Sequence, residues 1–130
     1  MIDFYAPQTA GEWLAFTSAV VTILFGVFCL VFPRSTLSIL RLQTKPENPE
    51  AVAESRGTMA GFYLGVGIVA ILFAQPFLWM ALGAGWAFTA AGRLVSMIFD
   101  RGFTSFNAMS LLLETALAAG PLLYVFGYVA

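Results

Sequence analysis

Two charged residues, Arg93 and Glu114, stand inside long apolar stretches of the sequence. An arginine at the centre of a membrane helix costs about 2.5–3.5 kcal/mol on insertion scales, so an ionisable group there marks a constrained or functional position. One interpretation is a buried ion pair that fixes helix register and binds nothing. The other is a site for a ligand, an ion or a proton. The sequence allows both.

Further polar residues recur around this pair at helical spacing. Asp100 follows Arg93 by seven residues, and Asn107 precedes Glu114 by seven, so each pair shares one helix face. Smaller polar groups, among them Ser110, lie between them. We therefore predict one polar cluster built from three helices. Its candidate members are Glu54, Arg56, Tyr63, Arg93, Asp100, Asn107 and Glu114.

The composition indicates that lipid, rather than water, surrounds most of the chain. Of 130 residues, 60% are hydrophobic and 10% are charged, whereas soluble domains carry about 25% charged residues. Histidine is absent and Cys29 is the single cysteine, which excludes a His/Cys zinc site, a Ser-His-Asp triad and an intramolecular disulfide. We expect no cofactor, since no nucleotide, haem or metal motif occurs. Six Lys and Arg residues argue against a nucleic-acid partner.

Apolar stretches long enough to cross a bilayer, about 20 residues each, position the cluster. The predicted spans are residues 10–32, 57–74, 77–99 and 106–129. A polar loop over 33–56 follows the first span, and a very short turn at Gln75-Pro76 separates the second span from the third. Residues 1–130 thus form one all-α domain, a four-helix transmembrane bundle.

The third and fourth spans bring the two buried charges to the same height. A helix rises about 1.5 Å per residue, so Arg93 lies roughly 10 Å from Asp100, and Glu114 roughly 12–13 Å from Phe106. A tight loop joins the two spans. Arg93 and Glu114 should therefore meet as an ion pair.

Local signals predict structure inside the long loop. Ser35-Thr36 is expected to cap a short segment whose leucines lie in the headgroup region. Asn48-Pro49 is typical of an N-cap followed by a proline at the first helical position. The second helix should therefore begin near Pro49 and project from the membrane.

Small residues recur every three or four positions on three spans, which allows another helix to approach closely. We expect them to pack within the bundle, with a dimer face as the alternative. The three stripes are Ser18, Thr22, Gly26 and Cys29; Gly57, Gly61 and Gly65; and Ala81, Gly85 and Thr89.

The fourth span contains Gly120-Pro121, which should kink the helix and free a backbone carbonyl near Leu117. Near the opposite end of the molecule from the loops, Trp13, Trp79 and Tyr128 are expected to form an interfacial aromatic belt.

The charge distribution predicts the orientation in the membrane. All six Lys and Arg residues lie in or beside the first and third loops, whereas the side that holds both termini carries Asp3 and Glu12. Because cytoplasmic loops carry the positive excess, both termini should lie outside the cytoplasm. The segment before the first span has no positive n-region and so differs from a cleavable signal peptide.

Several of these motifs together resemble a known family. Glu54-Ser55-Arg56-Gly57 leads into Gly61-Phe62-Tyr63-Leu64-Gly65, and Gly92-Arg93, Asp100, Asn107 and Glu114 follow. This pattern, over residues 26–117, is similar to the bacterial family called domain of unknown function 4345, and more distantly to DoxX-like membrane proteins. The resemblance implies a small four-helix protein of the bacterial inner membrane and singles out Glu54, Arg56, Arg93 and Glu114. It implies no reaction. The family usually has Asp-Gly after the third span, whereas here Arg101 separates Asp100 from Gly102.

Three classes of function fit the sequence. The first is a non-catalytic accessory or scaffold protein, partnered by a membrane complex or a second copy, with a structural charge cluster. The second is a binding or transport module for a small anionic or lipid ligand or for protons. The third, a membrane enzyme acting on a lipid or quinone, is least favoured because histidine and a paired-acid motif are lacking.

The orientation can be tested by cysteine labelling. In intact cells, a membrane-impermeant thiol reagent should label a chain carrying Ala130→Cys and leave Gln43→Cys unlabelled, because the positive-inside rule places residue 43 in the cytoplasm. The parent chain, with Cys29 inside a span, gives the background. The reverse labelling pattern would contradict the prediction.

Overall fold

The computed structural model describes residues 3–130, which fold into helices without any strand. The elements are α1 (Ala10–Val31), α2 (Pro33–Ile39), α3 (Glu50–Glu54), η1 (Ser55–Met59), α4 (Ala60–Phe73), α5 (Pro76–Phe99) and α6 (Ser105–Val125). Helices α3, η1 and α4 are continuous, so that four helices are long and apolar enough to cross a membrane. This confirms the predicted all-α membrane fold.

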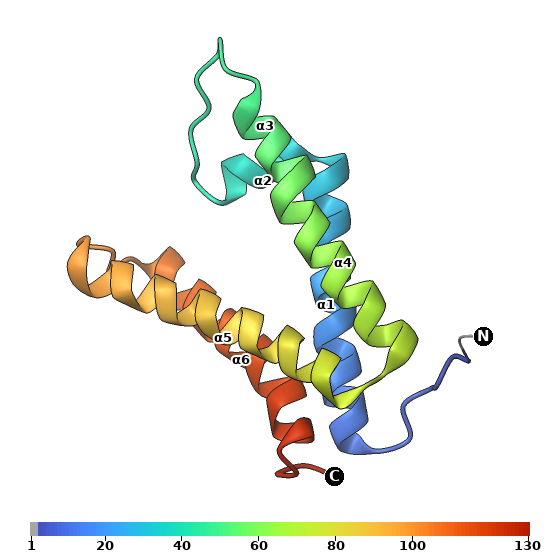
Figure 1. Cartoon of the computed structure of the whole chain (residues 1–130). Helices are drawn as coiled ribbons and strands as arrows, with labels where there is room; N and C mark the ends of the chain where they lie inside the picture. The colour runs from blue at the N-terminus through green and yellow to red at the C-terminus, as the bar shows by residue number, and fades with distance from the viewer. Residues whose placement is uncertain (1–2) are drawn as a thin grey trace.

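The helical bundle is made of two antiparallel pairs (Figure 1). Helix α1 packs along α4 and forms the first pair, and α5 packs along α6 and forms the second. The pairs are joined mainly through contacts of α1 with α6. They meet near the chain termini and diverge toward the loops. The two pairs are therefore in close contact at one end only.

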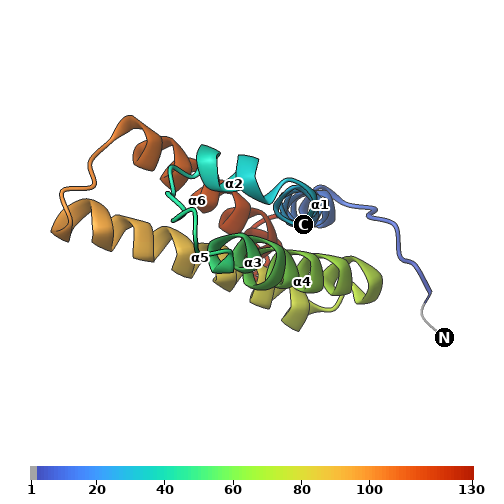
Figure 2. The same ribbon diagram turned by 90° about the horizontal axis from the view of Figure 1, so that it is seen from above.

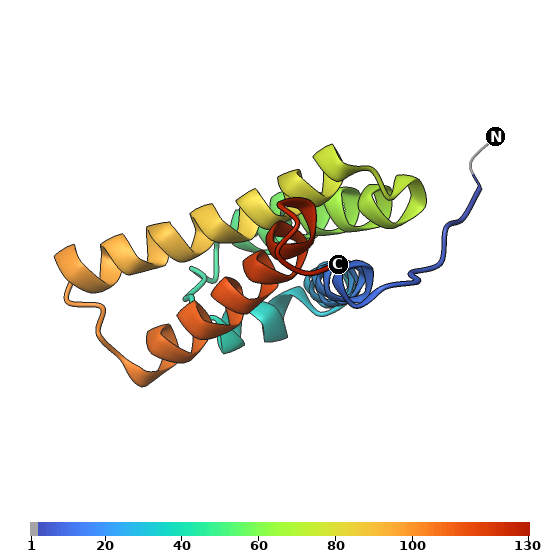
Figure 3. The same cartoon turned by 90° about the horizontal axis from the view of Figure 1, so that it is seen from below.

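The C-terminus lies beside the start of α1. The Gly11 amide donates to the Ala130 carbonyl at 2.8 Å, and Figure 3 shows the C-terminus beside the start of α1. Thr9 and Glu12 form a capping box that begins α1. The hydroxyl of Tyr5 donates to Glu12 at 3.1 Å, and this hydrogen bond raises the pKa of Tyr5.

The loop helices begin differently from the prediction. Helix α2 begins at Pro33, with Phe32 as N-cap and no side-chain cap, so the expected cap by Ser35-Thr36 is wrong. The Thr36 hydroxyl instead donates to the carbonyls of Phe32 at 2.9 Å and Phe28 at 3.3 Å. Both carbonyls also accept a backbone N–H, from Thr36 and Phe32 respectively. The Thr36 hydroxyl therefore adds a second donor where α1 passes into α2.

The start of α3 also differs from the prediction by one residue. Helix α3 begins at Glu50, and Pro49 is its N-cap, without a side-chain hydrogen bond. The predicted cap by Asn48 is therefore wrong, although the helix does begin beside Pro49.

At the other end of the chain, α6 ends at Val125 rather than at residue 129. Gly127 adopts a φ of 80° there, a backbone conformation that ends helices.

The stripe of small residues on α1 packs within the bundle as predicted. Ser18, Thr22, Gly26 and Cys29 are all buried. The Ser18 hydroxyl donates to the Leu117 carbonyl at 2.6 Å. Pro121 lies inside α6 and cannot donate to that carbonyl, so Ser18 replaces the missing partner. The prediction of a free carbonyl at Leu117 is confirmed, and its partner is on α1.

The other two stripes do not pack within the bundle. Gly57, Gly61 and Gly65 are exposed, and a Cβ atom added at any of them would meet nothing within 4 Å. Ala81, Gly85 and Thr89 are exposed as well. Helix α4 instead faces α1 through Gly67, where a Cβ would meet the Ala19 carbonyl at 3.2 Å. Gly67 lies roughly 200° around the helix from Gly65, and α4 is apolar on all sides, so composition could not distinguish the two faces.

The three residues of the predicted aromatic belt differ in their exposure. Trp13 and Tyr128 are 52% and 80% exposed, but Trp79 is 5% exposed. Trp79 belongs to the main hydrophobic core with Leu82 and Leu117. Its large ring fills the space where the two pairs meet, which outweighs a position at the interface.

The contact between α1 and α6 gives a stability prediction. A Cβ at Gly120 would lie 2.8 Å from the Leu14 carbonyl, a backbone atom that cannot move aside. Gly120→Ala should therefore lower the free energy of unfolding in detergent by about 1–3 kcal/mol. The matched control is Gly61→Ala, where the space is open. It should be neutral or stabilise by up to about 1 kcal/mol. Equal effects of the two substitutions would contradict this packing.

Candidate functional site

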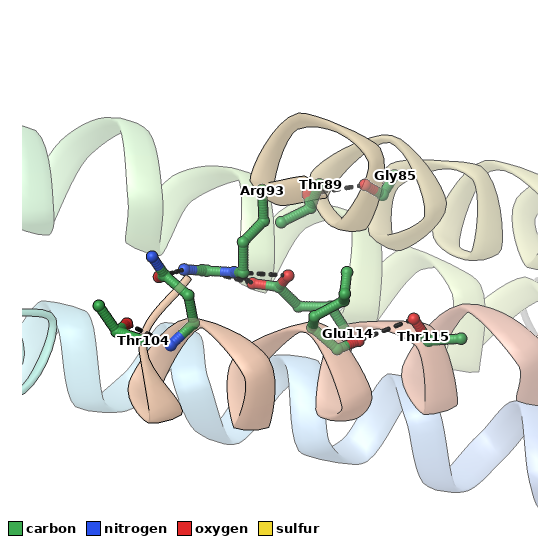
Figure 4. A network of polar contacts seen from close by, with 8 residues as sticks. Gly85, Thr89, Arg93, Thr104, Glu114 and Thr115 are labelled. Atoms are coloured by element: carbon green, nitrogen blue, oxygen red, sulfur yellow. Dashed lines mark hydrogen bonds and ion pairs between the residues drawn. The ribbon is translucent and has the colours of Figure 1, made fainter. Parts of the chain in front are cut away.

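An ion pair joins the two helices of the second pair. Arg93 on α5 donates from Nε to both carboxylate oxygens of Glu114 on α6, at 3.0 and 2.9 Å. Its Nη2 atom donates to Oε1 at 2.6 Å. The two side chains are 23% and 7% exposed, and Figure 4 shows them meeting between the helices. The predicted ion pair is confirmed. Its geometry is bidentate, which strengthens pairs between arginine and a carboxylate.

Asn107 extends this contact to the loop between α5 and α6. Its Oδ1 atom accepts from Arg93 Nη1 at 2.9 Å, and its Nδ2 donates to the Gly102 carbonyl at 2.8 Å. The backbone N–H of Asn107 donates to the hydroxyl of Thr104, the N-cap of α6, at 3.1 Å. The arginine is thus held from two sides. In this turn Arg101 has a φ of 55°, a backbone conformation that favours glycine.

A cavity of about 620 Å³ lies between the two pairs and reaches this ion pair. Its volume is within the range of small-molecule sites, about 300–1,000 Å³. Its polar end is formed by Tyr63, Thr89, Arg93, Ser110 and Glu114. The remaining lining is largely apolar and comes from Leu24, Phe25, Phe28, Cys29, Ile39, Leu40, Met59, Trp86, Phe106 and Leu113, together with Thr36.

Stacked aromatic rings support one side of the cavity. The rings of Tyr63 on α4 and Trp86 on α5 lie 5.5 Å apart at an angle of 13°. Trp86 Nε1 donates to the Thr22 hydroxyl at 2.8 Å, and Phe25 contacts the indole edge-on at 6.0 Å. Three helices are therefore fixed around Trp86, which gives this part of the cavity a defined shape.

Helix α2 covers the loop end of the cavity. It lies between α1 and α6 when the molecule is seen from above (Figure 2), and Thr36, Ile39 and Leu40 line the cavity. Just after it, the guanidinium of Arg41 lies 5.1 Å from the centre of the Phe106 ring on α6. This cation–π contact connects the first loop to the second pair.

The geometry can be compared with known proteins. A family model described as "Domain of unknown function (DUF4345)" matches residues 11–126. The chain belongs to this family. It matches no curated protein and no solved structure, and the more distant similarity to DoxX-like proteins is not shown. Family membership supports a membrane protein without assigning a reaction.

The residues that carry the resemblance to the family fall into two groups. Tyr63, Arg93 and Glu114 line the cavity, and Asn107 holds the arginine. The others, Glu54, Arg56 and Asp100, are exposed. Within residues 3–130 their side chains make no hydrogen bond or ion pair, and they do not line the cavity.

The shape of the bundle explains this division. The helix pairs diverge toward the loops, so residues near the loop ends of different pairs are far apart. In addition, Ser55–Met59 form a π-helical turn, which changes the phase of the helix relative to the 3.6-residue period that groups Arg56 with Tyr63. The buried Ser55 hydroxyl donates to the Cys29 carbonyl at 3.0 Å in this turn.

Two parts of the site were not predicted as site residues. Thr89 belonged to a stripe expected to pack against another helix, and Trp86 has no polar neighbour in sequence that would mark it. The contact of Arg41 with Phe106 just after α2 is another feature for which the sequence carries no signal. Across residues 3–130, no three His, Cys, Asp or Glu side chains are grouped to hold a metal ion.

The ion pair can be measured by a double-mutant cycle. Removing one partner of a buried pair costs about 3–5 kcal/mol in soluble proteins because a charge is left uncompensated. Arg93→Ala and Glu114→Ala should each lower thermal stability in detergent, and the double variant should lose less than the sum. Exchanging the two residues should restore part of the loss. Additive single effects would mean that the two side chains do not interact.

Proposed function

We propose that this family member is a non-catalytic membrane protein that binds an amphipathic molecule in the cavity between its helix pairs. The observation that carries the proposal is the cavity itself, with about 620 Å³ of space, an apolar lining and one polar end. Such a combination matches a molecule with an apolar tail and a polar head. A membrane supplies many molecules of this kind.

The fixed geometry of the polar end favours binding over proton-coupled transport. Glu114 accepts three hydrogen bonds from Arg93, and Asn107 accepts a further one from the same guanidinium. A carboxyl that carries protons across a membrane has to exchange its partners during the cycle. Here the partners of Glu114 form one rigid arrangement, which suits a stationary binding site.

We further propose the bacterial inner membrane as the location, with both termini outside the cytoplasm. The six basic residues in or beside the first and third loops support this orientation. In this orientation the polar end of the cavity lies in the cytoplasmic leaflet. The ligand would enter with its head toward the cytoplasm.

An accessory role in a membrane complex is a second proposal, favoured by the exposed glycines of η1 and α4. A shallow groove of about 360 Å³ is lined by Gly57, Thr58, Gly61, Phe62, Gly65 and Val66. Surfaces of this type allow close approach of another membrane helix. Gentle purification with identification of co-eluting proteins tests this role, and Gly61→Leu should abolish any specific association.

The binding function can be tested with two matched threonines. Thr89 and Thr115 each donate to the carbonyl four residues earlier, at 2.8 and 2.7 Å, and both are exposed. Of the two, Thr89 lines the cavity. Thr89→Trp should fill the cavity and abolish co-purification of a bound lipid, measured by native mass spectrometry. Thr115→Trp should retain the ligand at the level of the parent chain.

Either of two results would count against this function. A parent chain that carries no specific lipid in several mild detergents would indicate that the cavity is not a binding site. Equal loss of lipid in both tryptophan variants would indicate that the lipid binds elsewhere on the surface.

A further inference from the structure

The polar end of the cavity also indicates which head group the ligand carries. Resting on the function proposed above, we propose that the ligand is an uncharged amphipathic molecule whose head accepts hydrogen bonds, such as a carbonyl or ester group. This differs from the anionic ligand that a lone buried arginine would favour. Charge, hydrogen-bonding capacity and the surroundings of the cavity each support it.

The charges that line the cavity cancel. Among the described residues of the lining, Arg93 and Glu114 carry the formal charges, and they are in direct contact at 2.6 Å. Arg41 lies nearby, and its guanidinium is placed over the Phe106 ring. An anionic head would have to enter an apolar environment without a net positive charge to balance it, which is unfavourable. An uncharged head avoids this cost.

Several hydrogen-bond donors at the polar end of the cavity make no hydrogen bond within the described part of the chain. In the described part of the chain, the hydroxyls of Tyr63 and Ser110 make no hydrogen bond, although both residues line the cavity. A guanidinium has five N–H groups. Arg93 uses one on Nε, one on Nη1 and one on Nη2, so each terminal nitrogen keeps a second N–H.

The carboxylate and amide oxygens at this end already accept hydrogen bonds. Both oxygens of Glu114 accept from Arg93, and the Asn107 oxygen accepts from the same side chain. Because an arginine can only donate, a ligand group that uses its two remaining N–H groups has to accept, and the hydroxyls of Tyr63 and Ser110 can donate to the same group. A carbonyl or ester oxygen accepts hydrogen bonds and carries no charge.

The rest of the cavity fits the apolar part of such a molecule. Leu24 and Phe28 line the cavity and are also 59% and 37% exposed. The cavity is therefore continuous with the surface that faces lipid, and an acyl or isoprenoid tail can leave along it. The stacked rings of Tyr63 and Trp86 add a flat aromatic wall near the head.

Two kinds of membrane molecule share this chemistry, a diacylglycerol with ester carbonyls and a quinone with ring carbonyls. The full chain, stripped of lipid in detergent, should bind dioleoylglycerol or a long-chain ubiquinone, measured by native mass spectrometry. The anionic probe is dioleoylphosphatidic acid, which has the same acyl chains as dioleoylglycerol. We expect at least about 10-fold tighter binding of an uncharged probe. The preferred uncharged probe identifies the source.

Single-atom substitutions test the two hydroxyls. Tyr63→Phe keeps the ring stack and Ser110→Ala keeps the helix, so neither should change thermal stability. Each should weaken binding of the uncharged probe by about 2- to 10-fold, the value of one hydrogen bond. Tyr128→Phe removes an exposed hydroxyl at the other end of the molecule and is the control.

Glu114→Gln tests whether charge balance in the cavity excludes an anionic head group, because this substitution should increase the binding of phosphatidic acid. It leaves Arg93 uncompensated at nearly the same shape, so phosphatidic acid should become the preferred probe. Phosphatidic acid binding to the parent chain as tightly as diacylglycerol would overturn the proposed head group and leave the binding function intact. Unchanged binding in both hydroxyl variants would also overturn it. If none of the three probes bound, the proposed binding function itself would fail.

Discussion

The contact of Arg93 with Glu114 constrains the second half of the molecule more than any other interaction. Pairing two charges at membrane depth avoids the cost of leaving either one uncompensated, which favours a register of α5 and α6 that puts these residues at one height. The loop from Asp100 to Thr104 has to be short enough to allow this. Asn107 then fixes the loop by joining Arg93 to the Gly102 carbonyl. One ion pair therefore determines the register, the turn and the position of the cavity's polar end.

The first half of the molecule depends on different forces. Helices α1 and α4 carry no buried charge, and their contact relies on small residues such as Gly26 and Gly67, which bring the helices close. Thr22 and Ser18 add hydrogen bonds to Trp86 and to the Leu117 carbonyl on the second pair. Hydroxyl groups on one face of α1 thus link the two pairs, in addition to the hydrophobic core around Trp79. These are directional contacts, and they fix how the pairs meet.

The sequence predicts some of these features better than others, for physical reasons. The four spans follow from hydropathy, and the Arg93–Glu114 pair follows from the cost of isolated charge in lipid. The side of α4 that packs against α1 cannot be predicted from hydropathy, because the helix is apolar on all sides and has glycines on two faces. Arg56 was grouped with Tyr63 by a regular helical period that the π-helical turn at Ser55–Met59 interrupts. Thr36 acts as a partner for carbonyls of α1, which a cap prediction for its own helix could not show.

The cavity itself is a consequence of side-chain size along α1. Near the chain termini the contact face carries Gly11, Ala15 and Ser18, and the backbone of α6 approaches so closely that Gly120 lies against the Leu14 carbonyl. Further along the same helix the neighbouring residues are Phe25 and Phe28, which lie against Trp86 and the cavity. Large rings cannot pack as closely as glycines, so the pairs must diverge there. Because Arg93 and Glu114 lie on the diverging side, the space that opens between the pairs has one polar end.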